Sequence, residues 1–272
     1  MTVDPCGDFE QLASELRSRS GHLPENVVLM DTVDSTNRFV KGLIDRFFEE
    51  AATPRTAFVV AHEQTAGRGR QGRSWVSSAG RGLYCTWLQP LPVGQGALEE
   101  QLGALPLLVG VGVCRAVAGL IDGTALLKWP NDVLVGGRKI AGILIETVAG
   151  SDGEMAAVIG FGVNYDFGAG SELPTPLSTS LALEAGTPPS RAAVVERLAR
   201  SLERELGHCG DLNYTLDAYR ACTVHREGDE VSCRVGGETL AGRFAGFDSG
   251  GRFRLRTAAG LRTIASGEVI EA

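Results

Sequence analysis

Four short runs of β-forming residues follow one another between positions 125 and 166, with no helical segment between them, and they constrain the fold more than any other feature. The turn-forming sequence WPND separates the first two runs, and Gly136-Gly137 separates the second from the third. Parallel βαβ units would need a long crossover, usually a helix, between successive strands. Consecutive strands beside separate helices instead predict an α+β fold with a mixed, largely antiparallel sheet and flanking helices.

Amphipathic helices and two further strands are expected before and after these runs. Apolar residues at three- and four-residue spacing predict the helices, and short apolar runs rich in β-formers predict buried strands. The predicted helices cover residues 8–21, a segment that begins near Ser35, residues 100–122 and residues 190–207, and the predicted strands cover residues 56–65 and 81–91. We expect Pro106 to be tolerated only near the start of its helix, because proline lacks the amide hydrogen.

The sequence changes character from about Cys222. Short stretches of β-formers are broken there by Gly-Gly, Asp-Ser-Gly and Ala-Gly turns, and no helical period is present. A chain of 272 residues is long enough for one large domain with a small satellite. We therefore predict a large domain over residues 1–221 and a small SH3-like β-barrel over residues 222–272.

The composition argues against several classes of protein. The net charge of −7 is wrong for a protein that coats nucleic acid with its whole surface. No apolar run approaches the roughly 20 residues that span a bilayer, and the first ten residues carry acids where a signal peptide would carry Lys or Arg. The six cysteines form no CxxC pair, so reduced structural thiols are expected. These features predict a soluble cytoplasmic protein.

The stretch GRGRQGRSW places Gly67, Gly69 and Gly72 at the G-x-G-x-x-G spacing of dinucleotide-binding turns. Such a turn must open a helix and needs an acidic residue about 20 positions later to hold the ribose. The residues that follow oppose a helix, and no Asp or Glu occurs between Gln64 and Leu98. A nicotinamide-binding protein is therefore the weakest of the interpretations considered.

The arginines of this stretch indicate a different function, the binding of an anion. Arg68 and Arg70 lie between these glycines and Arg73 follows Gly72, in an otherwise acidic chain. Guanidinium groups suit carboxylate and phosphate oxygens, and glycines let backbone amides approach an anion closely. A solvated basic loop is the plain alternative, since charge runs usually face water.

Two lysines favour the anion-binding interpretation. Lys128 ends one predicted strand, and Lys139 follows it after the turn Pro130-Asn131-Asp132. The turn folds the flanking strands back and can bring both lysines to one sheet edge, where they would face the arginines and form a site for a triphosphate or an acyl phosphate. Singly, each lysine could equally be a surface residue, and Asn164 could equally be a turn or cap residue.

Three ordered motifs, EQTAGRGRQGRSW, LKWPNDVLVGGRKIAGILIE and IGFGVNYD, resemble those of the biotin protein ligases, the biotin–[acetyl-CoA-carboxylase] ligases. The similarity covers about residues 30–186 closely and the C-terminal part more loosely. It implies a class II synthetase-like catalytic domain and a two-step reaction. Biotin and MgATP give biotinyl-5′-AMP, and a lysine of a biotin carboxyl carrier domain then attacks this adenylate.

The resemblance also implies roles for individual residues. The implied catalytic residues are Lys128, Arg70 and Lys139. The implied biotin-binding residues are Ser35, Thr36, Asn37, Gln64, Arg68, Gly69, Arg70, Lys139 and Gly142, and the implied ATP- or adenylate-binding residues are Arg70, Arg73, Trp75, Lys128, Asn131 and Asn164. No metal ligands are assigned, and Asp132 could either orient the acceptor lysine or bind Mg²⁺.

Alternatives remain at this point. A lipoate or octanoate ligase or transferase shares the fold, and a non-catalytic biotin or nucleotide sensor would not need both lysines and all the loop arginines. Family members that repress transcription carry an extra N-terminal DNA-binding domain, for which the roughly thirty residues before the next element leave no room. We therefore expect a form without DNA binding and without membrane association. A homodimer is possible, although nothing in the sequence fixes an interface.

Overall fold

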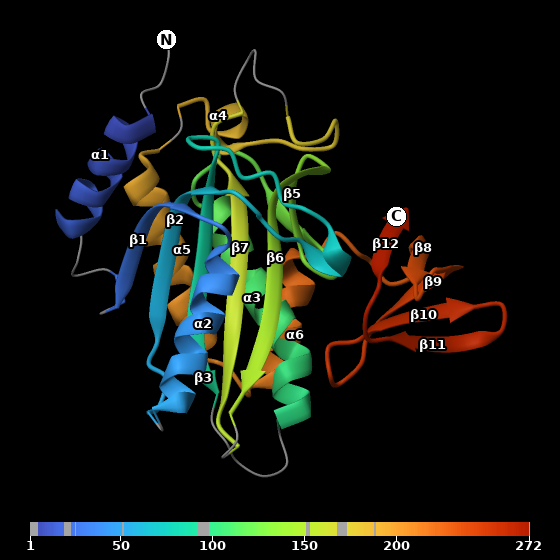
Figure 1. Ribbon diagram of the computed structural model, residues 1–272. Helices are drawn as coiled ribbons and strands as arrows, with labels where there is room; N and C mark the ends of the chain where they lie inside the picture. Colours follow the sequence, from blue (N-terminus) through green and yellow to red (C-terminus); the bar gives the residue numbers. More distant parts are fainter. Residues whose placement is uncertain are drawn as a thin grey trace.

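A seven-stranded mixed sheet forms the centre of the protein (Figure 1). The computed structural model describes residues 5–18, 23–24, 26–50, 52–91, 98–150, 153–167, 173–187 and 189–271. The strands lie in the order β1-β2-β3-β7-β6-β5-β4, and the β1–β2 pair is parallel whereas the other pairs are antiparallel. The strands are β1 (Val27–Val33), β2 (Ala57–Gln64), β3 (Gly82–Leu91), β4 (Ala125–Lys128), β5 (Asp132–Val135), β6 (Arg138–Ala149) and β7 (Met155–Asn164). The predicted sheet is confirmed.

The consecutive strands β4 to β7 fold back on one another as the turn chemistry predicted. Lys128 and Asp132 are register partners across the WPND turn between β4 and β5. Gly136 and Gly137, with φ of 56° and 77°, make the next turn, and only glycine adopts this left-handed backbone at little cost. The two turns therefore place β4, β5 and β6 side by side, with Lys128 on β4 and Lys139 on β6.

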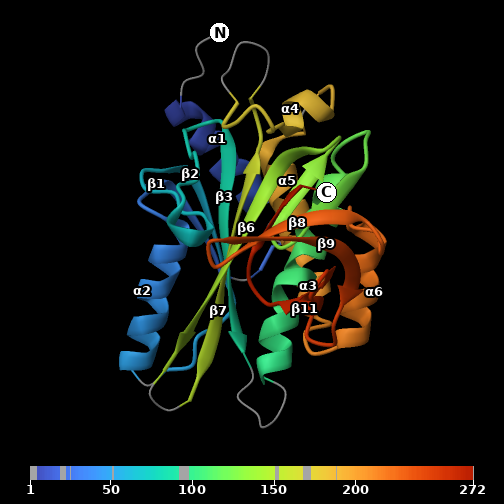
Figure 2. The ribbon, with the colours of Figure 1, turned by 90° about the vertical axis from the view of Figure 1, so that its right-hand side faces the viewer.

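Helices cover both faces of the sheet (Figures 1 and 2). One face packs against α2 (Thr36–Glu49), whose apolar residues share a small buried cluster with β2, β3 and β7. The opposite face buries the larger core against α1 (Pro5–Ser18), α3 (Leu98–Ala118), α5 (Arg191–Leu206) and α6 (Leu212–Cys222). A short helix, α4 (Leu181–Glu184), follows β7. No helix in the described ranges is long and apolar enough to cross a membrane.

The position of Pro106 and two elements, α6 and β1, differ from the sequence prediction. α3 begins at Leu98, so Pro106 lies inside the helix and not near its start. The turns before Pro106 are continuous with the apolar helix that follows, because packing against the core compensates for the missing hydrogen bond. Residues 19–21 of the first predicted helix lie outside the described residues. The helix α6 and the strand β1 were not predicted at all.

The C-terminal part is a five-stranded antiparallel sheet in the order β11-β10-β9-β8-β12, as expected for a small all-β unit. Its strands are β8 (Glu230–Val235), β9 (Glu238–Phe247), β10 (Phe253–Thr257), β11 (Gly260–Ile264) and β12 (Glu268–Glu271). Phe253 lies 5.1 Å from Trp129 between ring centroids, so one continuous core joins this sheet to the large domain. The division between residues 221 and 222 falls at the end of α6 and stays a prediction.

Candidate active site

The glycine- and arginine-containing stretch forms a closed loop, here called the arginine loop (residues 67–75), that connects β2 to β3. Gly69 donates its backbone N–H to the carbonyl of Arg73 at 2.7 Å, and Trp75 donates to the carbonyl of Gly67 at 3.0 Å. A single 3₁₀ turn over Arg70–Gly72 forms its tip, and the strand β3 follows. Since no helix opens after the glycines, the loop is not a Rossmann turn, as the sequence predicted.

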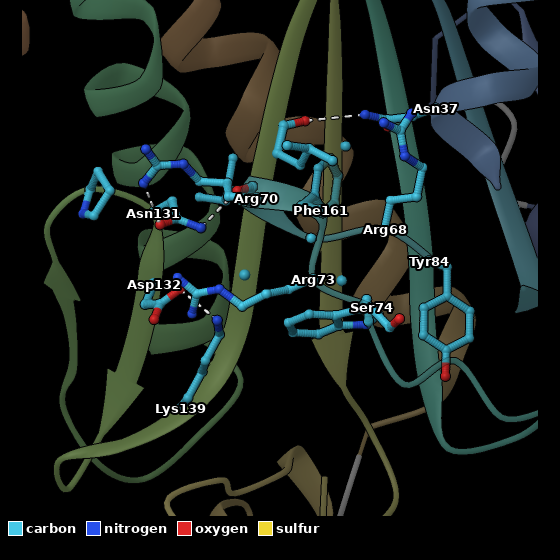
Figure 3. Close-up of a pocket in the computed structure, with 18 of the residues that line it drawn as sticks. Asn37, Arg68, Arg70, Arg73, Ser74, Tyr84, Asn131, Asp132, Lys139 and Phe161 are labelled. Atoms are coloured by element: carbon cyan, nitrogen blue, oxygen red, sulfur yellow. Dashed lines mark hydrogen bonds and ion pairs between the residues drawn. The ribbon is translucent and has the colours of Figure 1, made fainter. Parts of the chain in front are cut away.

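The arginine loop closes one side of a pocket on the α2 face of the sheet (Figure 3). All but one of the residues predicted for the site line this pocket. They are Ser35, Thr36, Asn37, Gln64, Arg68, Gly69, Arg70, Arg73, Trp75, Lys128, Asn131, Lys139 and Gly142. The loop, the start of α2 and the β4–β6 strands, which are far apart in sequence, therefore meet at one cavity.

Buried polar residues at the start of α2 are held in fixed positions. The side-chain oxygen of Gln64 accepts hydrogen bonds from the Thr36 backbone N–H at 2.9 Å and from its hydroxyl at 3.1 Å. Asn37 accepts from the Thr86 hydroxyl at 2.8 Å, and its amide donates to the Glu146 carboxylate at 3.0 Å. This end of the pocket is therefore preorganised to hold a polar, neutral group.

Glu146 on β6 joins three elements beside this end of the pocket. Its carboxylate lies 2.5 Å from the Lys41 ammonium of α2 and 3.6 Å from the Arg68 guanidinium of the arginine loop. Burial acts to raise the pKa of Glu146, but the hydrogen bonds from Lys41 and Asn37 outweigh it and lower that pKa. The sequence did not single out Glu146, although it joins the arginine loop to Asn37 and Lys41 of α2.

The two lysines are brought to the same pocket, as the turn chemistry predicted. Lys139 lies 2.6 Å from the Asp132 carboxylate (Figure 3). Its ammonium also lies 5.2 Å from the ring centroid of Trp75. Lys128 lines the pocket from the end of β4, where its register partner is Asp132. Ammonium groups from β4 and β6, which lie on either side of β5, thus line the same pocket as the guanidinium groups of the arginine loop, and this positive charge suits an anion.

Glycines on β6 and β7 form a flat shelf for the Trp75 indole. A methyl group at Gly142 would lie 2.7 Å from the indole ring, and one at Gly162 would collide with the indole nitrogen. A methyl group at Gly160 would collide with the Asn37 amide. The alternating glycines of the sequence GFG were the signal for this shelf, since residues two apart on a strand share a face.

The C-terminal sheet contributes to the pocket, which the sequence did not predict. Glu268 and Val269 line it. The Glu268 carboxylate accepts two hydrogen bonds from Arg73, at 3.0 and 2.7 Å. Arg70 donates to the Asn131 side chain at 3.1 Å and to the carbonyl of Gly267 at 3.3 Å. Burial lowers the pKa of Arg70, whereas the Glu268 hydrogen bond raises that of Arg73.

Asn164 is the one predicted site residue that does not line the pocket in the described part of the chain. It is buried at the end of β7, where its amide donates to the carbonyls of Thr179 at 2.9 Å and Lys139 at 3.3 Å. These bonds hold the segment after β7 against β6. The Asn164 amide thus has a structural role in this structure, and its contact with the adenylate stays a prediction.

Cys85 is a thiol on the pocket wall. Its side chain is 1% exposed, and burial strongly raises its pKa. Acyl transfer to cysteine requires the thiolate, which is the nucleophile. Cys85 is therefore a core residue and unsuited to carry a covalent acyl intermediate.

His225 supports the turn that carries Lys128. Its Nε2 accepts the backbone N–H of Trp129 at 3.1 Å, and its ring packs against Phe244 and Phe253 of the C-terminal sheet. Burial, helped by the nearby charge of Lys128, lowers the pKa of His225 from 6.5 to about 4. The neutral ring is therefore the form that the folded protein keeps.

This shift predicts how stability depends on pH. Between pH 6.5 and about 4 the unfolded chain protonates His225 whereas the folded chain does not. The free energy of unfolding should fall as pH falls through this window, by about 3 kcal/mol from this residue. Denaturant melts of the parent and the His225→Gln variant at pH 7 and pH 4.5 measure it. The variant should lose less stability over that interval, and equal losses would contradict the assignment.

Comparisons with known proteins show which family the chain resembles. Residues 29–164 match the Biotin/lipoate A/B protein ligase family, and residues 228–270 match the Biotin protein ligase C terminal domain. The chain is 34% identical over 223 residues to the biotin--[acetyl-CoA-carboxylase] ligase of Paracoccus denitrificans. The alignment covers 79% of this chain and 90% of the relative. It is 27% identical over 256 residues to the bifunctional ligase/repressor BirA of Bacillus spizizenii, with coverage of 90% and 74%. The solved structure of the biotin protein ligase from Aquifex aeolicus in complex with biotin and ATP matches with a TM-score of 0.70 at 27% identity, over 90% of this chain and 98% of that one.

Proposed function

The chain belongs to the biotin protein ligase family and is an ATP-dependent biotin ligase, and from this premise we propose which residues perform the reaction. The observation that carries the proposal is the convergence of the arginine loop, both lysines and the preorganised start of α2 on one pocket. The acceptor we propose is a lysine of a biotin carboxyl carrier domain.

Biotin would lie at the α2 end of the pocket. Its ureido group needs neutral hydrogen-bond partners, and the buried side chains of Ser35 and Thr36 and the half-buried side chain of Gln64 are of this kind. Its carboxylate would point towards Lys139 and Arg70. Trp75 on its glycine shelf provides an apolar ring next to the space where the adenosine would lie.

In the first step a biotin carboxylate oxygen attacks the α-phosphorus of ATP, and the bond to the β-phosphate breaks as pyrophosphate leaves. Negative charge collects at the α-phosphate in the transition state, so fixed positive charge there lowers the barrier. Lys128, at the end of β4, is the residue we propose for this contact. In the second step the neutral amine of the acceptor lysine attacks the biotinyl carbonyl, AMP leaves, and the amine gives up a proton.

Mg²⁺ would arrive with the triphosphate. Within the described ranges no cluster of three or more His, Cys, Asp or Glu side chains could hold a metal. Mg²⁺ commonly uses one or two carboxylates together with substrate phosphates and water, and Asp132 is the pocket carboxylate placed for this. When bound, the ion would neutralise charge on the phosphates that leave.

The pocket also bears on the rival functions. A transferase that carries the acyl group on a thiol is disfavoured because Cys85 is buried with a raised pKa. A non-catalytic sensor would not need cationic side chains on both sides of the region where the phosphates of ATP would lie. Release of pyrophosphate from ATP tests the proposal: it should require biotin, and lipoate should not replace it. Release that depends on lipoate alone would show that the chain acts on the rival substrate.

A further inference from the structure

The turn that opens β12 binds both arginines of the arginine loop tip. Arg73 donates one hydrogen bond to each oxygen of Glu268, at 3.0 and 2.7 Å, which is the paired geometry that guanidinium and carboxylate favour. Arg70 donates to the Gly267 carbonyl and the Ser266 hydroxyl, each at 3.3 Å. The loop and this turn lie almost 200 positions apart in the chain, so the contact exists only when the C-terminal sheet is docked.

The arginine loop needs such support to stay closed. Its glycines give it many open conformations, and each ordered residue costs backbone entropy. Gln71 at the tip has a φ of 55°, a left-handed backbone that residues other than glycine rarely adopt. The side chain of Arg73 is still 56% exposed, so the loop tip lies on the surface with the Glu268 ion pair as an anchor.

We propose that Glu268 is a positioning residue that holds the arginine loop closed over the pocket, so that the C-terminal domain controls how fast nucleotide enters and adenylate leaves. This inference rests on the proposed function for the identity of the ligand. Glu268 does not have to release Arg73 when phosphate binds, because a guanidinium carries more N–H donors than the two that the carboxylate takes. Arg73 can therefore contact the adenylate and Glu268 at the same time.

A contact that stabilises the closed loop has a distinct kinetic signature. Weakening it should speed both entry and escape, since each requires the loop to open. A residue that merely binds the ligand would change the escape rate and leave the entry rate alone. A residue that merely stabilises the fold would change the unfolding midpoint and neither rate.

The test compares Glu268→Gln with Glu230→Gln in the full chain. Glu230 pairs with Arg243 inside the C-terminal sheet, away from the loop, and serves as the matched control. Hydrogen exchange of the amides in residues 67–75, without ligands, should become about fivefold faster in Glu268→Gln, the effect of losing a partly exposed ion pair. It should not change in Glu230→Gln. Unchanged exchange in Glu268→Gln would overturn the proposal.

Rapid-mixing measurements complete the test. In Glu268→Gln, association of ATP with the biotin-bound enzyme and dissociation of pre-formed adenylate should both become several-fold faster. A faster dissociation alone would reduce Glu268 to a ligand contact and overturn the positioning role.

Swapping the charges of Glu268 and Arg73 tests their contact independently of catalysis. Glu268→Arg alone should speed hydrogen exchange of the loop amides. Glu268→Arg combined with Arg73→Glu should slow this exchange again, although the double variant loses an adenylate contact. Failure of the second change to restore protection would overturn the proposal. An enzyme that shows all these exchange effects but never uses biotin would contradict the proposed function and leave the positioning role intact.

Discussion

Lys128→Ala should lower the rate of adenylate formation by about 10²- to 10³-fold while biotin binding changes little. Lys128 lines the pocket from the end of β4, together with the arginines of the arginine loop. Its charge is most valuable when negative charge builds up at the α-phosphate, so its loss affects the transition state more than the ground state. Single-turnover formation of adenylate and calorimetric titration with biotin give the two quantities separately.

Two controls make this prediction specific. Lys128→Arg keeps the charge and should recover part of the rate. Arg220→Ala removes an exposed arginine on α6 that pairs with Asp217, and should leave both quantities unchanged. Equal losses of rate and of biotin affinity in Lys128→Ala would make Lys128 an ordinary binding residue.

Arg70→Gly should release the adenylate about 100-fold faster. Arg70 lies at the loop tip and bonds to Asn131, Ser266 and Gly267, so it fastens the loop to the rest of the pocket. Hydrogen bonds from a charged group contribute about 1.5–3 kcal/mol each, and glycine removes all of them while adding backbone freedom. The dissociation rate of pre-formed adenylate, measured by trapping with excess unlabelled biotin and ATP, reports the effect.

The expected consequence of Arg70→Gly is leakage of a reactive intermediate. A mixed anhydride that escapes can acylate free amines, so the variant should modify added amines that the parent does not. Arg220→Ala again serves as the control. A dissociation rate equal to that of the parent would refute the proposed role of Arg70.

Local turn chemistry made the centre of the site predictable. The WPND sequence fixes a reversal, and the strands on its two sides then place Lys128 and Lys139 at one pocket. The rejection of a Rossmann turn was equally local, because it depended on the residues that follow Gly72. Both conclusions needed only neighbours in sequence.

Contacts between distant segments were not predictable in the same way. Glu268 meets Arg73 across 195 positions, and no local pattern marks such a pair. Helix α6 did carry a local signal, because Asp211 caps it by accepting from the Tyr214 backbone N–H at 3.0 Å. Asn164 has a backbone partner that the sequence did not predict, the carbonyl of Thr179, and its contact with the adenylate stays a prediction.

The most direct test of the account is the transfer reaction itself. Purified chain, ATP, Mg²⁺ and an isolated biotin carboxyl carrier domain are incubated with biotin or with lipoate, and the intact mass of the carrier domain is measured. The account predicts one biotinyl group on the carrier domain, none when its acceptor lysine is replaced by arginine, and no lipoyl product. A carrier domain that stays unmodified with biotin and accepts lipoate would contradict it.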